Sequence, residues 1–282
     1  SAGNNHGVYI FSSSTNNNIS RNIIATNGTS INVGVIVEES ATTGNFVEHN
    51  TINTTGTADS NIGVWMLSSV SGTLVNNNTI RTNGSNGGNH GIRIQDSAVS
   101  NTVANNTIRT AGAAANNWGI WLLTSANSNT VIGNVIVTNG TGNQQRGILV
   151  TESSSSNLIA NNNITTSGSS SNNAGIFIGD ATTSSNTFTN NTIYTSGTNT
   201  NIGIHYQNVN GVNTFTANNI TTTGAGSHAI VLDVANFSVF NNTWLDSPVD
   251  WVLSTPNSQG NFSNTTFQSS NGSIRFVGLF TV

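Results

Sequence analysis

The feature of this chain that most constrains its fold is an internal repeat of about 28 residues. A glycine followed by an apolar-x-apolar triplet recurs eight times, and a degraded ninth copy begins at Ala229. The gaps between successive copies are 27, 29, 28, 28, 28, 28 and 28 residues, for repeat glycines at Gly7, Gly34, Gly63, Gly91, Gly119, Gly147, Gly175 and Gly203. Self-similarity at one period predicts a solenoid, in which each repeat stacks on its neighbours.

Each repeat contains three short runs in which apolar and polar residues alternate, bounded by Asn, Ser and Gly. Alternation of this kind predicts β-strands, and the runs lack the i, i+3, i+4 spacing of an amphipathic helix. The first strand is expected to place two columns in the core, Val8, Val35, Val64, Ile92, Ile120, Ile148, Ile176 and Ile204, and Ile10, Val37, Met66, Ile94, Leu122, Val150, Ile178 and Tyr206. The second strand contributes Ile19, Val47, Val75, Val103, Val131, Ile159, Phe188 and Phe215, and the third Ile24, Ile52, Ile80, Ile108, Ile136, Ile164, Ile193 and Ile220. We therefore predict three strands per turn around one narrow core.

Stacked turns also explain the composition, in which Asn (51), Thr (40), Ser (36) and Gly (29) dominate and hydrophobic residues make up only 34%. Parallel turns about 4.8 Å apart bring like residues together in ladders, so few apolar residues suffice. An Asn ladder is predicted at the bends, because Asn tolerates left-handed backbone angles and its amide can bond the Asn above and below, at Asn22, Asn50, Asn78, Asn106, Asn134, Asn162, Asn191 and Asn218. A glycine column is predicted to mark turns with positive φ, at Gly28, Gly56, Gly84, Gly112, Gly140, Gly168, Gly197 and Gly224.

The Gly-Ile-x-Ile, Asn-x-Val and Asn-Asn-Thr-Ile motifs cover about residues 4 to 244. They resemble those of the right-handed parallel β-helix of the pectin-lyase-like superfamily, especially its NosD-like repeat proteins, which are common among secreted and archaeal surface proteins. The resemblance implies an all-β fold, a right-handed parallel β-helix of about nine turns over residues 1–244, and an extracellular or cell-surface location. Because the superfamily contains lyases, hydrolases, adhesins and structural proteins, it leaves the activity open.

Composition excludes several classes of function. Ten acids against six bases, all Arg, give a formal charge of −4 and no basic patch, which argues against nucleic-acid binding. No apolar run approaches the roughly 20 residues of a membrane span, so membrane insertion is not expected. The chain has no Cys, which removes disulfides and thiolate metal sites. The opening residues lack Met and a signal-peptide pattern, which favours a processed product or an excised region.

The two ends of the repeat array differ. From about Leu245 the period is lost, and Pro and aromatic residues replace the Asn-Asn-Thr-Ile pattern, which predicts a closing element over residues 245–282. Residues 1–6 run straight into the first coil with no visible cap. An uncapped parallel edge is a template for another chain, so we expect self-assembly, head to tail or side by side, into a surface structure or filament.

Three acids, Asp96, Glu152 and Asp180, fall at the outward position five residues after a repeat glycine. Glu152 and Asp180 are on adjacent turns, where their carboxyls could lie about 5 Å apart, the separation of a retaining glycosidase pair. This allows a polysaccharide hydrolase or lyase as an alternative. The lyases that the superfamily resemblance brings in have an Arg or Lys base beside calcium-binding acids, and no motif here matches them. Because no such motif matches, we expect no catalysis. The five His fall in separate turns, so we also expect no metal site, and no cofactor is expected.

The outward position between the two core residues of the first strand is bulky and apolar instead of polar. This strip is a candidate interface or glycan surface, and it could be covered by a loop or the C-terminal segment, by a polysaccharide, or by another copy. Its main members are Tyr9, Ile36, Trp65, Trp121, Leu149 and Phe177, with Arg93, His205 and Val231 in the same column.

Two further columns carry alternatives. If the protein is secreted, the best-placed N-glycosylation acceptors are Asn27, Asn83 and Asn139, each beside the loop glycine, and Asn271 is a fourth candidate. A column of Thr partly resembles the Thr rows of ice-binding β-solenoids, which makes ice binding a minor alternative. Because the residue two before each Thr is the core Ile, these Thr are expected to face inward or line a bend: Thr26, Thr54, Thr82, Thr110, Thr138, Thr166, Thr195 and Thr222.

Overall fold

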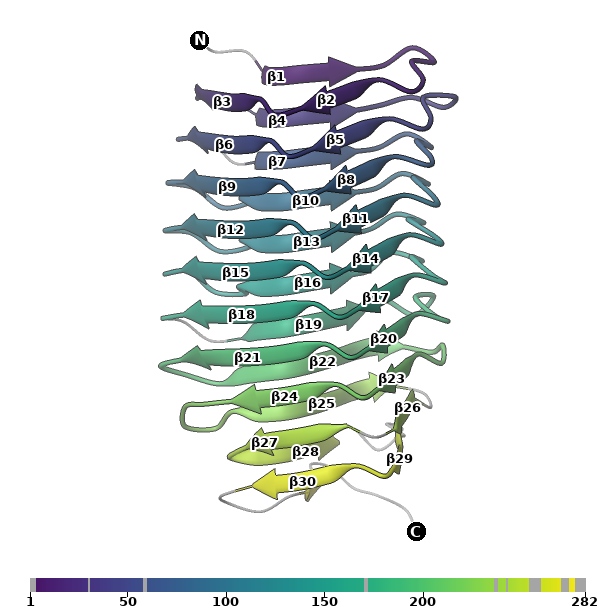
Figure 1. Cartoon of the computed structure of the whole chain (residues 1–282). Helices are drawn as coiled ribbons and strands as arrows, with labels where there is room; N and C mark the ends of the chain where they lie inside the picture. The colour runs from purple at the N-terminus through teal and green to yellow at the C-terminus, as the bar shows by residue number, and fades with distance from the viewer. Residues whose placement is uncertain are drawn as a thin grey trace.

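The computed structural model describes residues 4–29, 31–57, 60–169, 172–235, 238–241, 243–253, 260–269 and 274–276. The regular secondary structure within these ranges consists of β-strands alone. The strands wind as a right-handed parallel β-helix, as predicted, with one coil for each sequence repeat (Figure 1). Among these residues there is no helix with the length and apolar character needed to cross a membrane.

Three parallel sheets form the sides of the coil. Sheet A contains β1 (Asn5–Ile10), β4 (Asn32–Val37), β7 (Asn61–Met66), β10 (His90–Ile94), β13 (Trp118–Leu122), β16 (Arg146–Val150), β19 (Asn173–Gly179), β22 (Asn201–Val209), β25 (His228–Ala235), β28 (Val249–Leu253) and β31 (Ile274–Phe276). Sheet B contains β2 (Asn18–Ser20), β5 (Phe46–Glu48), β8 (Leu74–Asn76), β11 (Thr102–Ala104), β14 (Thr130–Ile132), β17 (Leu158–Ala160), β20 (Thr187–Thr189), β23 (Thr214–Thr216), β26 (Ser238–Asn241) and β29 (Gly260–Ser263). Sheet C contains β3 (Ile23–Gly28), β6 (Thr51–Gly56), β9 (Thr79–Gly84), β12 (Thr107–Gly112), β15 (Val135–Gly140), β18 (Asn163–Gly168), β21 (Thr192–Gly197), β24 (Asn219–Thr222), β27 (Trp244–Ser247) and β30 (Thr266–Ser269).

The strand register stacks like residues on like, as the repeat predicts. Ile92 pairs with Val64 on one side and with Ile120 on the other. The four predicted core columns are confirmed: nearly all their members belong to one continuous buried cluster, with Val8 and Ile19 of the first coil packed against it. In the C-terminal half the core column contributed by the second strand of each coil becomes aromatic, and Phe188 and Phe215 stack with ring centroids 4.8 Å apart.

The repeat glycine is required by the narrowness of the core. A Cβ added to Gly91 would lie 2.2 Å from Cγ2 of Ile108 in sheet C and 2.5 Å from the carbonyl oxygen of Gly119 on the next coil. Because the second of these atoms belongs to the backbone, it cannot rotate away. The glycine that reveals the repeat in the sequence is therefore the position where sheets A and C come closest.

The predicted Asn ladder is confirmed at the bend between sheets B and C. Asn106 donates from Nδ2 to Oδ1 of Asn134 at 3.0 Å and to the carbonyl oxygen of Val75 at 2.9 Å. Its own Oδ1 accepts from the backbone N–H and from Nδ2 of Asn78. Two further ladders, which the sequence analysis missed, follow the other bends and are buried apart from Asn17 and Asn5 of the first coil. One contains Asn17 and Asn45 and, after an interruption at Thr73, Asn101, Asn129, Asn157, Asn186 and Asn213. The other contains Asn5, Asn32, Asn61, Asn89, Asn117, Gln145, Asn173 and Asn201.

Two expectations about backbone angles were wrong. The ladder Asn residues do not take positive φ; the residue before each one does, as at Asn77 (53°) and Asn105 (55°). In the predicted glycine column only Gly197 and Gly224 have positive φ. The others are glycine for lack of space, because a Cβ at Gly84 would lie 2.3 Å from Nδ2 of Asn61.

Parallel pairing continues past the end of the sequence repeat. Among the described residues, nine strands of sheet A precede residue 245, and β28 then pairs with β25 in the same parallel sense. In sheets B and C, β29 and β30 also extend the coil. The change of residue types at 245 is thus not a change of strand pairing among the described residues, and closure of the solenoid by residues 245–282 stays a prediction.

Candidate functional site

The strip predicted on the first strand lies on the outer face of sheet A, but most of it is covered. Ile36 is only 4% exposed, Leu149 2% and Phe177 6%, whereas Tyr9 at the N-terminal coil is 44% exposed. The strip packs against a second outward row, formed by the residue before each repeat glycine: His6, Val33, Ile62, His90, Trp118, Arg146, Ala174, Ile202 and His228. Contacts within the chain thus account for the burial, and a role of the strip as an interface or glycan surface stays a prediction.

Two rows face outward because the alternation of the strand breaks at the repeat glycine. A Cβ on Gly91 would point at Ile108 in the core, and the next residue, Ile92, is also buried in the core. Two successive residues thus face inward, which leaves His90 and Arg93 side by side on the outer face. The apolar members of the two rows lie in three small clusters separate from the central core. Arg93 lies on the coil between the first two clusters, and Arg146 lies on a coil of the second.

Arginines and aromatic rings alternate along this face. The guanidinium of Arg93 lies 4.4 Å from the ring centroid of Trp121 and 5.2 Å from that of Trp65, which are its partners on the two neighbouring coils. The guanidinium of Arg146 lies 3.6 Å from the ring centroid of Phe177 and 5.7 Å from that of Trp118. A cation held over an aromatic ring is attracted by the negative electrostatic potential of the ring face, most strongly where water is excluded.

Burial controls the protonation of the groups on this face. Burial, together with a smaller contribution from a nearby arginine, lowers the pKa of His90 to about 3 and that of His205 to about 4, so both imidazoles are neutral near pH 7. Burial also lowers the pKa of Arg146 to about 10 and that of Arg93 below its ordinary value, while the charges of Asp96 and Glu152 act on Arg93 in the opposite sense. Both arginines are still cations at neutral pH.

A hollow of about 390 Å³ opens beside Arg93. Its lining combines the rings of His90, Trp118 and Trp121 with polar groups of neighbouring bends, from Ser60 and Asn116, and the backbone of Gly87 and Gly88. The imidazole of His90 stacks on Trp118 with ring centroids 4.8 Å apart and planes 19° apart. The buried Nδ1 of His90 and Nε of Arg93 have no hydrogen-bond partner in the described part of the chain.

The three candidate acids lie where the strand of sheet A ends and the chain bends. Asp96, Glu152 and Asp180 have φ values of 52°, 53° and 80°, in the left-handed region. Each accepts a hydrogen bond from a nearby side chain, and Thr124 of the preceding coil donates to Glu152 at 2.6 Å. Among the described residues no hydrogen bond joins one of these carboxylates to another. Their local role is to hold the bends, and a catalytic pair stays a prediction.

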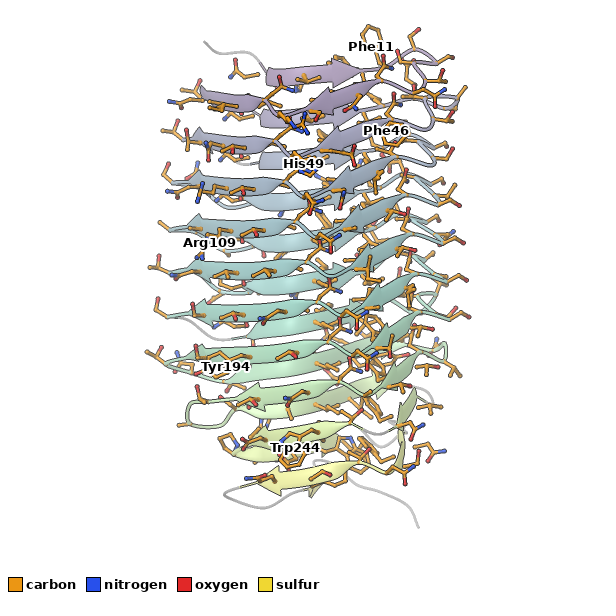
Figure 2. The ribbon with its side chains drawn as sticks, viewed as in Figure 1. Phe11, Phe46, His49, Arg109, Tyr194 and Trp244 are labelled. Carbon is orange, nitrogen blue, oxygen red and sulfur yellow. The ribbon has the colours of Figure 1, made fainter. Side chains whose placement is uncertain are left out.

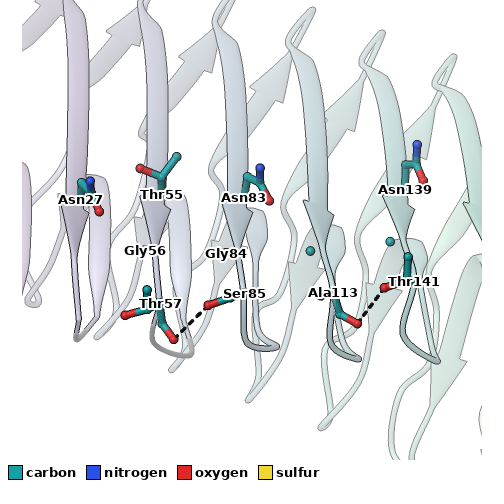
Figure 3. Close-up of a pocket in the computed structure, with 12 residues that line it drawn as sticks. Asn27, Thr55, Gly56, Thr57, Asn83, Gly84, Ser85, Ala113, Asn139 and Thr141 are labelled. Atoms are coloured by element: carbon teal, nitrogen blue, oxygen red, sulfur yellow. Dashed lines mark hydrogen bonds between the residues drawn. The ribbon is translucent and has the colours of Figure 1, made fainter.

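A second hollow, a groove of about 630 Å³, runs along the outer edge of sheet C (Figure 3). Asn27, Thr55, Asn83 and Asn139 lie along it on successive or alternate coils, each on its own strand of the sheet. The three Asn side chains are exposed, so the predicted glycosylation acceptors are accessible, and their modification stays a prediction. The fourth, Asn271, lies outside the described residues.

The rest of the outer face of sheet C mixes polar side chains with exposed apolar ones, among them Ile23, Val135 and Trp244. Arg109 on β12 and Tyr194 on β21 stand outward from it (Figure 2). The predicted Thr column lies on the opposite side of the same strands, in the interior, where Thr54 and Thr166 are fully buried. The burial of the column excludes it as an ice-binding surface.

Sequence reasoning missed the second outward row. Of this row, only the histidines are considered in the sequence analysis, as possible metal ligands. The signal that could have found the row is an alternation of cationic and aromatic residues in two columns three positions apart. Arg93 and Trp121 belong to one column, and Trp118 and Arg146 to the other.

Comparisons with known proteins agree with this architecture. The family described as periplasmic copper-binding protein (NosD) matches residues 1–164. No curated protein matches the chain. Among solved structures, one from the Vag8–C1 inhibitor complex is 17% identical, covering 95% of this chain and 72% of that chain with a TM-score of 0.49.

Two enzymes are also similar in structure. The A-module of the Azotobacter vinelandii mannuronan C-5 epimerase AlgE6 is 14% identical, covering 92% of this chain and 81% of that chain with a TM-score of 0.39. Endopolygalacturonase I from Stereum purpureum, complexed with two galacturonates, is 12% identical, covering 92% of this chain and 95% of that chain with a TM-score of 0.21. At these identities the likeness concerns the fold and not the activity.

The residues of this chain do not fit a copper centre of the kind that the family description names. Copper sites are built from His, Cys and Met side chains. The chain has no Cys, and its one Met, Met66, is fully buried among apolar side chains of the core. Within the described ranges no three His, Cys, Asp or Glu side chains come together as a metal site. The match covers 164 of the 282 residues and the fold agrees with it, and on that basis the chain belongs to the NosD family of β-helix proteins.

Proposed function

We propose that this chain is a non-enzymatic β-solenoid of the periplasm or the extracellular surface, and that copies of it associate end to end. The observation that carries the proposal is the strand edge of the first described coil. Among the described residues β1, β2 and β3 each pair with a strand on one side only. A hollow of about 310 Å³ lined by Val8, Ile10 and Ile19 exposes the core at this edge.

A second copy is the occupant that best fits this edge. Unpaired parallel strands recruit a strand of the same direction, and the far end of the same chain presents the last strands of all three sheets, β29, β30 and β31. Contact between two different ends of one molecule is heterologous, so repetition gives a filament if the rotation does not close. The periplasmic description of the family supports a location outside the cytoplasm.

Sedimentation velocity and negative-stain electron microscopy of the purified 282-residue chain test this proposal. We expect oligomers that grow with protein concentration and rods one coil in width. Replacing Val8 by Lys places a charge at the edge and should shift the chain to monomer, whereas Tyr194→Lys on the outer face of sheet C should not. A wild-type monomer at every concentration would refute end-to-end association.

The absence of catalysis is open to a separate test. A screen of acidic and neutral polysaccharides, with the Glu152→Gln variant beside the wild type, should show no turnover by either protein. Depolymerisation by the wild type that is lost in Glu152→Gln would establish the hydrolase or lyase alternative instead, with Asp180 as the second carboxylate.

Polysaccharide binding is the second candidate function, and the groove along sheet C favours it. The groove repeats hydroxyl and amide groups at the spacing of the coils over the length from Asn27 to Thr141. Affinity electrophoresis on neutral glycans should show retardation that Asn83→Tyr abolishes by filling the groove. Asn163→Tyr is the matched control, because Asn163 is exposed on the same sheet outside the groove lining. Equal retardation of both variants would contradict binding in the groove.

A further inference from the structure

The cation at the centre of the outer face of sheet A has no anion beside it. Arg93 is half-buried, and no carboxylate of the described residues forms a hydrogen bond or an ion pair with its guanidinium. Charges removed from water are normally paired in proteins. The chain carries an excess of acids, yet Asp96 and Glu152 act on Arg93 only through their field and bond to Gln95 and Thr124.

The guanidinium is held in an orientation that leaves its edge for a ligand. Trp65 and Trp121 cover its two faces from the neighbouring coils, and Nε is buried. The remaining donors are those at the end of the guanidinium, which form a planar fork that matches an oxyanion. Because the two indoles fix the plane of the fork, little side-chain entropy is left to lose on binding.

The hollow beside Arg93 offers contacts for more than the oxyanion. His90 is 3% exposed and lines the hollow with its ring, whereas its unpartnered Nδ1 is buried out of reach of a ligand. Ser60 and Asn116 contribute neutral polar groups on the side of the bends, and Trp118 and Trp121 form an apolar wall. A volume of about 390 Å³ exceeds that of a bare inorganic ion and lies within the range of small-molecule sites.

We propose that this hollow is a binding site for a sugar acid, with Arg93 receiving the carboxylate, Ser60 and Asn116 bonding hydroxyl groups, and Trp118 and Trp121 contacting the ring. Each group of such a ligand is complementary to a feature of the lining. The negative charge pairs with the unpaired cation, the hydroxyl groups bond to the neutral polar groups, and the apolar face of the sugar ring packs on the indoles. The site lies on sheet A, so it depends neither on end-to-end association nor on the groove of sheet C.

Arg146 suggests how the site extends along the axis. It is two coils away, about 10 Å at the rise of a parallel coil, and its guanidinium also lies over an aromatic ring. Its one hydrogen bond to a side chain, from Nη2 to Oε1 of Gln144 at 3.3 Å, leaves it without a carboxylate partner in the described structure. A chain of linked sugar acids should therefore bind more tightly than one sugar acid, through both cations.

Titration of the full chain with D-glucuronate, followed by tryptophan fluorescence, tests the site, because Trp118 and Trp121 line it. D-glucose and inorganic phosphate are the comparison ligands. We expect a saturable change with glucuronate and none with glucose. Arg93→Gln should weaken glucuronate binding about tenfold or more, while Arg109→Gln removes the same charge from the exposed face of sheet C and should leave it unchanged.

If Arg93→Gln fails to fold, Arg93→Lys takes its place in the test. It keeps the charge without the fork, so it should bind glucuronate less tightly than the wild type. Equal binding of glucose and glucuronate by the wild type would overturn the proposal, as would glucuronate binding that Arg93→Gln leaves intact. Binding of phosphate without binding of glucuronate would overturn the assignment to a sugar acid. None of these outcomes depends on whether the protein forms filaments.

Discussion

Replacing Asn106 by Asp changes one atom in the middle of the Asn ladder between sheets B and C. Asn106 is 1% exposed. Its Oδ1 accepts from the backbone N–H of Asn78 at 2.9 Å and from Nδ2 of Asn78 at 3.0 Å, and an aspartate can keep both bonds. Its Nδ2 donates to Val75 and Asn134, and an aspartate puts an acceptor oxygen against these two acceptors instead.

The expected cost follows from this count of bonds. Two hydrogen bonds are lost, each with a net value of about 1 kcal/mol, and the carbonyl oxygen of Val75 loses this donor, at roughly 1–3 kcal/mol. Oδ1 of Asn134 keeps a donor, the backbone N–H of Asn106. The sum is about 3–5 kcal/mol near neutral pH, which corresponds to a fall in Tm on the order of 10 °C for a chain of this size. Asn106→Ala removes Oδ1 as well as Nδ2, so all four of these hydrogen bonds are lost and two donors of Asn78 lose their acceptor; it should therefore cost at least as much as Asn106→Asp, and without a dependence on pH.

The cost of the Asn106→Asp variant should depend on pH. Burial raises the pKa of the new carboxyl in the folded state above its unfolded value of about 3.9, so the folded form holds the proton more tightly. Protonated, the carboxyl donates one hydrogen bond back to the ladder. The variant is therefore least impaired below about pH 4 and loses stability as the pH rises through the raised pKa.

Thermal unfolding followed by circular dichroism from about pH 4 to about pH 8 checks the argument, with the wild type at each pH. Asn83→Asp is the matched control, because Asn83 is exposed and should change stability by less than about 0.5 kcal/mol. An Asn106→Asp variant as stable as the wild type at neutral pH, or one whose deficit does not grow with pH, would refute the reading of the ladder as a buried, oriented hydrogen-bond chain.

Two more predictions follow from buried positions. Gly119→Ala places a Cβ 2.3 Å from Cγ2 of Ile136 and 2.5 Å from the carbonyl oxygen of Gly147, so denaturant unfolding should show a loss of about 3 kcal/mol or more, and an unchanged midpoint would contradict the close approach of sheets A and C. Burial raises the pKa of Asp250 to about 6, so its carboxylate opposes folding increasingly as the pH rises through that value. Asp250→Asn should therefore raise Tm at about pH 8 and not at about pH 4, and an equal shift at both would show that the charge is not the cause.

The sequence predicts the fold of this protein well because one repeat of the sequence forms one coil of the β-helix. A strand pair such as Ile92 and Ile120 is 28 residues apart in the chain and directly adjacent in sheet A, so column identity and contact coincide. The reasons behind columns are harder to predict. Gly84 was expected for its backbone angle and is required by the amides of Asn61 and Asn89, a contact that involves a ladder the repeat analysis had not identified.

The outer face of sheet A shows where prediction from columns fails. Strict alternation places Arg93 outward and leaves the direction of His90 undecided, because the repeat glycine breaks the alternation between them. A contact such as that of Arg146 with Phe177 then joins residues that lie on different coils and in different rows. No single column contains it, so the pairing of cations with aromatic rings emerges only when the coils are stacked.

The same separation explains how a chain can belong to the NosD family without residues for copper. The coil of this chain is held by three features: the glycine that lets two sheets approach, the inward Ile and Val, and the Asn that bonds the coil above and below. None of these side chains is available to a ligand, since all are consumed in holding the coil. Binding chemistry can reside only in the outward rows, where one repeat carries Trp65, the next Arg93 and the next Trp121 without disturbing the core. The fold therefore constrains the scaffold, and the outward rows, repeat by repeat, determine what it binds.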